Sequence, residues 1–160
     1  MNVVTAVEGD IPAWLDLARE VEALFGVPLS TDASFLAALR RNIQRGSAFC
    51  VRDQDGPPGA ALAGGLLFSS KRAPAYELGW LAVGAAWRRM GVGRALVDHA
   101  AALVVPPAEL VVTTFVEGEP GGAPARNFYL DLGFEPAEVF TAQTPPGAKR
   151  QRFRKPILGY

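Results

Sequence analysis

Three arginines and two glycines within seven residues form the stretch of the chain best suited to chemistry. Arg88, Arg89, Gly91, Gly93 and Arg94 follow a short apolar run and open a segment with helical periodicity. The first amides of a helix have no intrahelical partner, and the helix N-terminus carries partial positive charge. Glycines let an anion approach those amides, and arginines add full charge. The stretch is therefore interpreted as a cradle for a diphosphate.

The spacing around the glycines does not fit two common phosphate-binding loops. A P-loop needs lysine followed by serine or threonine, whereas Arg94 and Ala95 follow the second glycine here. A dinucleotide-binding fingerprint needs a third glycine where Leu96 stands, and it expects the glycines close behind the first strand of a βαβ unit. The diphosphate must therefore belong to a different class of ligand.

The cradle lies inside an alternation of strands and helices that predicts a mixed α/β domain. The strands are expected at residues 2–7, 48–52, 60–68, 77–83, 110–115, 138–143 and 150–154. The helices are expected from Asp10, as N-cap before Pro12, to Gly26; from Asp32 or Ser34 to Gly46; from the glycine pair to Pro106; and from Pro124 to Gly133. The connecting loops are expected at 53–59, 69–74, 117–123 and the Pro145-Pro146-Gly147 turn.

Two residues with reactive side chains fall inside these elements rather than at a site. His99 lies on the apolar stripe of the third helix, with Val92, Ala95, Leu96 and Leu103, so we expect it to pack rather than to catalyse. Cys50 lies in an apolar strand without an activating partner, so a covalent cysteine intermediate is not expected.

Composition limits the classes of protein to consider. The chain has 160 residues, enough for one domain spanning residues 1–160, and 49% hydrophobic content supplies a core. Sixteen basic residues balance sixteen acidic ones, which argues against nucleic acid as a partner. A single cysteine and a single histidine argue against an internal disulfide and a metal cluster. With no signal peptide or membrane span in the sequence, we expect a soluble cytoplasmic protein.

A dense run of positive charge occurs near the end of the chain. It comprises Lys149, Arg150, Arg152, Arg154 and Lys155. In a strand the three arginines share one face, and we interpret them as protecting an exposed edge of the sheet against aggregation. An anionic acceptor or partner surface is the alternative.

Two motifs together resemble the GNAT superfamily of acyl-coenzyme A dependent N-acyltransferases. Arg88-x-x-Gly91-x-Gly93 resembles the superfamily's coenzyme A signature, and Ala125-x-x-Phe128-Tyr129-x-x-x-Gly133-Phe134 resembles its second signature. The resemblance covers nearly the whole chain, and the order of elements matches. It implies a central, mostly antiparallel mixed sheet of six to seven strands, splayed between the fourth and fifth, with four flanking helices.

The resemblance also implies how acetyl-coenzyme A would bind. Its pantetheine arm would pair with the backbone of the central strand, where the Val83 amide could polarise the thioester carbonyl. Its diphosphate would rest on the amides of residues 89–94. The implied cofactor-binding residues are Leu81, Ala82, Val83, Arg88, Arg89, Met90, Gly91, Val92, Gly93, Arg94 and Arg126.

Two catalytic residues follow from the same resemblance. Tyr129 resembles the tyrosine that protonates the departing thiolate as general acid, and its alternative role is packing. Glu77 stands where some members carry a general base; its alternative role is that of an ordinary exposed carboxylate. The other candidates for the base are Glu22, Asp32, Glu117 and a water relay.

The sequence departs from the superfamily at three places. Gly122 replaces an asparagine that contacts pantetheine, and Gly84-Ala85-Ala86 replaces a turn that commonly holds proline. No basic residue directly follows Tyr129, which leaves Arg126 or Arg94 for the adenosine phosphate.

The expected function is transfer of an acetyl group from acetyl-coenzyme A to a primary amine, by direct attack in a ternary complex and without metal. The acceptor is a small-molecule amine or a peptide amine, and a homodimer is possible. The alternative is a non-enzymatic acyl-coenzyme A binding or sensing module. Substituting Tyr129 separates the two hypotheses.

Overall fold

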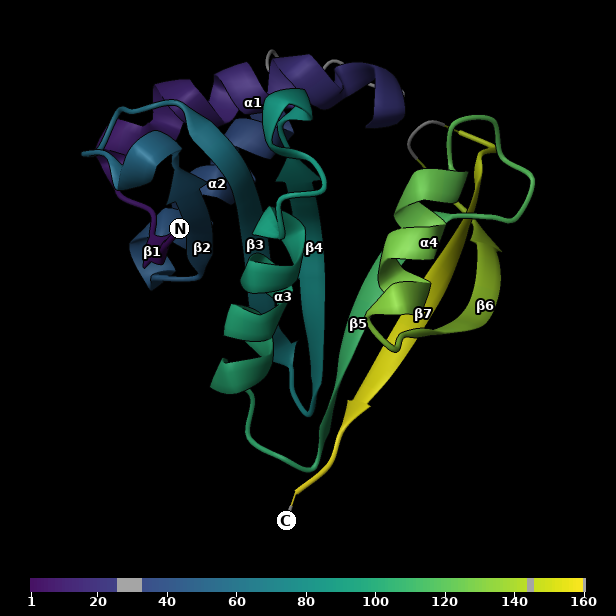
Figure 1. Cartoon of the computed structure of the whole chain (residues 1–160). Coiled ribbons are helices and arrows are strands. Elements are labelled where there is room, and N and C mark those ends of the chain that lie inside the picture. Colours follow the sequence, from purple (N-terminus) through teal and green to yellow (C-terminus); the bar gives the residue numbers. More distant parts are fainter. Residues whose placement is uncertain (26–32, 144–145, 160) are drawn as a thin grey trace. The chain divides into compact units, whose positions relative to one another are not determined.

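The computed structural model describes residues 1–25, 33–143 and 146–159, without the side chains of residues 23–25. Within these residues the chain forms seven strands and four α-helices (Figure 1). The strands are β1 (Val3–Thr5), β2 (Ala48–Arg52), β3 (Leu62–Arg72), β4 (Ala75–Val83), β5 (Ala108–Phe115), β6 (Glu135–Thr141) and β7 (Lys149–Ile157). The helices are α1 (Ile11–Phe25), α2 (Ala33–Arg45), α3 (Val92–Leu103) and α4 (Ala123–Asp131).

The strands form one sheet in the order β1-β2-β3-β4-β5-β7-β6. β4 and β5 are parallel, while the pairs β1 with β2, β2 with β3, β5 with β7 and β6 with β7 are antiparallel. This mixed sheet with four helices confirms the predicted GNAT fold. The pairing of β4 with β5 runs from Ala75 opposite Glu109 to Leu78 opposite Val112.

The chain divides into two compact units. The first unit contains residues 1–68 and 79–103, and the second contains residues 69–78 and 104–160. β4 contributes to both, because its first four residues belong to the second unit and its last five to the first.

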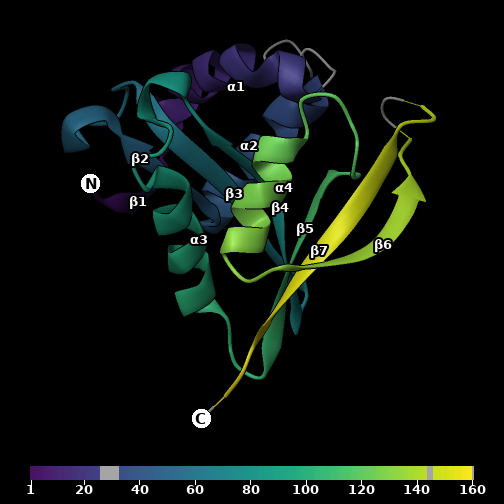
Figure 2. The ribbon, with the colours of Figure 1, turned by 45° about the vertical axis from the view of Figure 1, so that its right-hand side comes forward.

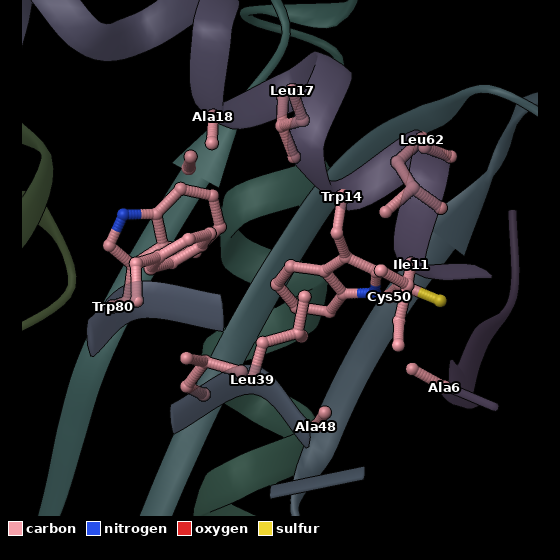
Figure 3. Close-up of a cluster of buried hydrophobic side chains, with 14 of the residues drawn as sticks. Ala6, Ile11, Trp14, Leu17, Ala18, Leu39, Ala48, Cys50, Leu62 and Trp80 are labelled. Carbon is pink, nitrogen blue, oxygen red and sulfur yellow. The ribbon is translucent and has the colours of Figure 1, made fainter. Parts of the chain in front are cut away.

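The core of the first unit gathers aromatic side chains from α1, α2 and β4 (Figure 3). The Trp14 ring lies 5.6 Å from that of Trp80, and the Phe35 ring lies 5.2 Å from Trp80, measured between centroids. Leu39 from α2 is fully buried in the same cluster. Burial of this apolar area is the main force that holds α1 and α2 on the sheet.

Two glycines in β3 let helices approach the sheet on both of its faces. A Cβ on Gly65 would lie 2.6 Å from the Trp14 ring, and a Cβ on Gly64 would lie 2.7 Å from Val92 Cγ1 in α3. Neighbouring residues of a strand point to opposite faces. The glycine pair that weakens the propensity of this strand therefore allows close packing of α1 on one face and α3 on the other.

In the second unit, α4 packs on one face of β5 and β7 (Figure 1). Phe153 of β7 and Leu110 of β5 are fully buried there, and Phe134 after α4 is nearly so. The end of α4 is a Schellman motif: Phe134 N–H bonds to Tyr129 O at 3.0 Å, and Gly133 N–H bonds to Leu130 O at 3.0 Å. The predicted helix end at Gly133 is confirmed.

Several predicted boundaries need correction. β3 continues through the polar residues 69–72, predicted as loop, because hydrogen bonding to β4 holds this exposed arm without burial. In α3, Leu103 is exposed while Val97 and Ala100 are buried, because the buried stripe is rotated from the predicted one. β6 and β7 begin earlier than predicted, and β7 also ends later. Three positions lie outside the described residues: Gly26, Asp32 and Pro145.

The explanation of the basic run as edge protection is wrong. β7 lies between β5 and β6 in the sheet, so it is an internal strand, and β6 forms the edge. The error has a physical origin, because a run of charges shows which face of a strand meets solvent but not which neighbours pair with its backbone.

Candidate active site

The loop from β4 to α3 has the backbone conformation expected of an anion-binding turn. Arg89 has φ of 63° and Gly91 has φ of 83°, both left-handed. Left-handed residues alternating with ordinary ones are typical of backbone turns whose amides converge on an anion. Arg88, Arg89 and Arg94 are exposed. A left-handed φ is unusual for arginine and costs backbone strain.

The amides of this loop remain available to a ligand. Within the described part of the chain, the backbone amides of residues 88–94 donate no hydrogen bond to the protein. The next amide, Ala95 N–H, donates to Gly91 O at 3.0 Å. Seven successive amides, of which the last three belong to the first turn of α3, therefore come before its first regular backbone hydrogen bond. Such donors at a helix start suit a phosphate, and the nearby guanidinium groups add charge.

A carboxylate on α1 positions the beginning of this loop. Glu20 Oε1 accepts a hydrogen bond from Ala85 N–H at 2.6 Å. Beside it, Trp87 packs over Gly84, where an added Cβ would lie 2.9 Å from the ring. Neither role was predicted from the sequence, where Gly84 in place of the usual proline is the signal of a side chain packed over the turn.

A hollow of about 220 Å³ adjoins the same loop. Trp87, Met90 and Val92 line it from the loop side, together with Met1, Ala63 and residues 51–55. Arg52 in its wall already pairs with Asp10 at 2.7 Å. The hollow therefore combines an apolar wall with a guanidinium neutralised by Asp10 and with the acidic residues Asp53 and Asp55.

Tyr129 belongs to α4, which lies beside β5 (Figure 2), and it is part of an aromatic cluster of the second unit. Its ring centroid lies 5.1 Å from that of Phe128, 5.4 Å from that of Phe134 and 6.3 Å from that of Phe153. Burial raises the pKa of the phenol well above its usual value of 10.0. The hydroxyl therefore stays protonated at physiological pH, as a proton donor must.

Gly122, where the resemblance led us to expect an asparagine, has no room for a side chain. A Cβ there would lie 2.6 Å from Phe115 Cβ. Gly122 is also the N-cap residue of α4, with Pro124 in the first turn. The departure from the superfamily pattern is thus explained by close packing at the start of this helix.

The carboxylates proposed as bases differ in their surroundings. Glu77 is exposed between buried Tyr76 and Leu78, and it stands opposite Val111 of β5. Glu117 is exposed in the loop after β5, and Glu22 is half-buried on α1 and already has an interaction partner. Asp32 lies outside the described residues.

The two arginines considered for the adenosine phosphate also differ. Arg126 Nη1 donates to Phe115 O at 2.8 Å and to Gln151 Oε1 at 2.6 Å, and the guanidinium lies 5.0 Å from the Phe153 ring centroid. It therefore ties α4 to β5 and β7. Arg94 is exposed in the first turn of α3, within the same unit as the amide-lined loop.

The other predicted residues take the following places. Ala82 is buried, and Leu81 and Val83 are half-buried at the end of β4. His99 packs edge-on against Phe49, 4.6 Å between ring centroids, and Cys50 is fully buried. Within the described residues, no group of three or more His, Cys, Asp or Glu side chains could hold a metal ion, and no helix has the length and apolarity to span a bilayer.

The units divide the predicted site residues into two sets. Leu81, Ala82, Val83 and residues 88–94 belong to the first unit, while Glu77, Arg126 and Tyr129 belong to the second.

Comparisons with known proteins agree with this architecture. A family model described as an acetyltransferase (GNAT) domain matches residues 44–136, more than half of the chain. A search of curated protein sequences finds no match.

Several solved structures share the fold at low sequence identity. A GNAT acetyltransferase from Bacillus cereus is 16% identical with a TM-score of 0.73, covering 99% of this chain and 98% of its own. An aminoglycoside 6'-N-acetyltransferase complexed with coenzyme A is 14% identical with a TM-score of 0.71, covering 100% and 99%. The ribosomal-protein-S18-alanine N-acetyltransferase from Escherichia coli is 17% identical with a TM-score of 0.69, covering 99% and 95%.

The fold and the family match together place the chain in the class of acyltransferases. The chain belongs to the GNAT family of acetyltransferases.

Proposed function

We propose that residues 1–160 act as a single N-acetyltransferase domain, which transfers an acetyl group from acetyl-coenzyme A to a primary amine by direct attack in a ternary complex. The observation that carries this proposal is the row of unbonded amides at residues 88–94, flanked by three exposed arginines. An adenine nucleotide with a diphosphate and a thioester arm is the ligand that this family suggests for such a loop.

The residues present fit the diphosphate of coenzyme A. Its phosphate oxygens need several donors and a compensating positive charge, and the loop offers both. Glycine at position 91 keeps a Cβ away from the donors, and its φ of 83° is costly for other residues. Arg88, Arg89 and Arg94 would hold the phosphates, and Leu81 to Val83 would offer backbone groups to the pantetheine arm.

When bound, acetyl-coenzyme A supplies an acetyl thioester, which is already activated for attack by an amine. The Val83 amide is proposed to donate a hydrogen bond to the carbonyl oxygen. The Tyr129 hydroxyl is proposed to donate its proton to the departing sulfur, consistent with the burial that keeps it protonated. Glu77 is proposed to accept the proton of the acceptor amine, directly or through water.

Direct attack is preferred to a covalent enzyme intermediate because the described chain offers a poor thiol nucleophile. Cys50 is fully buried, and burial, with a smaller contribution from Asp10, raises its pKa to about 12. Thiolate is the nucleophilic form, so almost none is present at neutral pH.

The acceptor is proposed to be a primary amine on a small molecule or on a peptide. The names of two structural relatives refer to an aminoglycoside and to a ribosomal protein alanine, so both kinds of acceptor occur on this fold. Cytoplasmic location and a possible homodimer remain part of the proposal, and neither nucleic acid nor membrane is expected as a partner.

The test is a Tyr129→Phe substitution assayed with acetyl-coenzyme A and a panel of amines. We expect turnover to fall about 100-fold or more, within the range for loss of a general acid, while coenzyme A affinity stays within about twofold. A wild-type protein that binds coenzyme A but acetylates no amine would instead favour the non-enzymatic sensing module. Unchanged turnover in Tyr129→Phe would contradict the role of this phenol.

A further inference from the structure

The face of β5, β7 and β6 opposite α4 carries a row of arginines. The register places Arg154 opposite Val111, Arg152 opposite Thr113 and Arg150 opposite Phe115, so these residues share one face. α4 covers the other face of β5 and β7 (Figure 1). Phe153 and Tyr129 are buried on that side.

The row changes in character along β7. At one end, Arg154 Nη1 lies 2.7 Å from Glu109 Oε1 and its Nη2 lies 3.0 Å from Glu138 Oε2, so this guanidinium is already neutralised. In the middle, Arg152 lies 3.7 Å from Glu138. At the other end, Arg150 pairs with no carboxylate in the described part of the chain, and its Nη1 donates to Lys149 O at 3.1 Å. Positive charge therefore remains at the Arg150 end.

Aromatic rings lie under two of the three arginines, Arg150 and Arg152. The Arg150 guanidinium lies 5.3 Å from the Phe115 ring centroid, and that of Arg152 lies 4.6 Å from the Phe140 ring centroid. Stacking on a ring restricts the side chain and leaves its N–H edge free for a bidentate contact. Two fixed guanidinium groups two residues apart, about 7 Å along the strand, suit a carboxylate better than mobile lysines would.

Glu77 lies on this same face of the second unit. It stands opposite Val111, which in turn stands opposite Arg154. The path from Glu77 to Arg152 crosses two strand spacings, from β4 through β5 to β7, and then runs two residues along β7. Ideal sheet geometry therefore places the two Cα atoms about 12 Å apart. A cationic amine at Glu77 and an anion at Arg152 or Arg150 would therefore belong to one ligand of peptide size. The arginine side chain itself covers part of that distance. About two to four extended residues of a bound peptide would span the rest.

From this arrangement we infer that the acceptor is the N-terminus of a peptide with an acidic side chain at its third or fourth position, held by Arg150 and Arg152 while its amine lies at Glu77. This inference rests on the proposed function. A terminal amine also demands less of the base than a lysine does, because its pKa is about 7.7 to 8.0 rather than about 10.4. It is thus partly neutral at pH 8 before any proton is removed.

The experiment compares peptides that differ in one residue. Peptides with a free N-terminus that carry glutamate, glutamine or lysine as their third or fourth residue, and a control with glutamate only as the eighth residue, are assayed with acetyl-coenzyme A at two salt concentrations. We expect kcat/KM for the peptide with the early glutamate to exceed that of its glutamine counterpart about tenfold, mostly through KM, and to fall as salt rises. Equal rates across the panel, or a preference for lysine, would overturn the inference.

A charge reversal at the arginines supplies the second arm. R150E/R152E should invert the order, so that the lysine peptide becomes the better substrate, while coenzyme A affinity stays the same. The matched control is R40E/R41E on the exposed side of α2, which changes the net charge equally and should leave the order unchanged. If R150E/R152E keeps the wild-type preference, the two arginines do not determine which acceptor peptide is preferred.

The two levels of proposal fail in different ways. Absence of coenzyme A binding and of any acetylation would contradict the proposed function itself. Robust acetylation of peptides without regard to charge would leave that function in place and overturn only the acidic specificity. Urea unfolding of R150E/R152E checks that the variant is folded before its rates are compared.

Discussion

At the scale of single residues, Asp10 and Arg52 form a buried ion pair. Asp10 is fully buried and accepts hydrogen bonds from Arg52 Nε at 2.9 Å, Arg52 Nη2 at 2.7 Å and the amides of Val7 and Gly59. These bonds join the entry of α1 to the end of β2 and to the loop after it. Removing one partner of such a pair leaves the other charge uncompensated.

The pair predicts a pH dependence of stability. Burial raises the pKa of Asp10, but hydrogen bonds from Arg52, Val7 and Gly59 outweigh it, so the folded pKa lies below its ordinary value of 3.8. A lowered carboxyl pKa means that the stabilisation is present above about pH 4 and is lost as pH falls through the folded pKa. Urea unfolding of the wild type between pH 3 and 7 should show this loss, and D10N should flatten the curve.

The same pair predicts a large effect of truncation. D10A should lower the free energy of unfolding by about 3 to 5 kcal/mol at pH 7. The matched control is D16A, which breaks an exposed pair with Arg19 at 3.0 Å and should cost less than about 1 kcal/mol. Equal losses in the two variants would show that burial does not govern the Asp10 interaction.

A second prediction at this scale concerns Gly65 of β3. G65A would place a Cβ 2.6 Å from the Trp14 ring, so the ring or the strand must move. We expect a loss of about 1 to 3 kcal/mol in urea unfolding, typical of an overpacked core. In the control G9A, the added Cβ would make only an ordinary contact of 3.5 Å with Pro58, and a full-sized loss there would contradict the steric explanation.

At the scale of elements, the start of α3 should respond to backbone conformation separately from charge. G91A forces an alanine to φ of 83°, which costs about 1 kcal/mol and disturbs the row of amides. G118A imposes nearly the same strain, at φ of 84°, in a loop of the second unit. Both variants should lose similar stability, but only G91A should weaken coenzyme A binding, by about tenfold or more in calorimetry. Equal affinities would remove Gly91 from the binding loop.

How far the sequence predicts each element depends on the range of the interactions involved. The end of α4 at Gly133 and the start of α3 were predictable because capping and periodicity act within a few residues. The contacts Asp10 with Arg52 and Glu20 with Ala85 join residues 42 and 65 positions apart, and no local pattern reveals them. The place of β7 inside the sheet was mispredicted for the same reason.

The same difference between local and long-range interactions applies to the residues of the candidate site. The anion-binding loop proposed at residues 88–94 could be predicted from spacing, because its glycines and arginines lie in one continuous stretch. Arg126 could not be assigned, since its hydrogen bonds to Phe115 and Gln151 come from separate strands. The lack of room at Gly122 likewise depends on Phe115, a residue of another element.

At the scale of the whole molecule, the fold contributes one binding function through each compact unit. The first unit presents the amides of residues 88–94, and the second presents the face with Arg150 and Arg152. The formal net charge of the chain is zero, so selectivity must come from these local arrangements rather than from a general field.

The most direct test of the central claim is calorimetric titration of the wild-type protein with coenzyme A, dephospho-coenzyme A and acetyl-pantetheine. The first two keep the diphosphate and the third lacks it. If the amides of residues 88–94 hold the diphosphate, the first two should bind with affinities within about tenfold of each other, and acetyl-pantetheine should bind at least about 100-fold more weakly. Equal binding of all three ligands, or no heat with coenzyme A, would contradict the account.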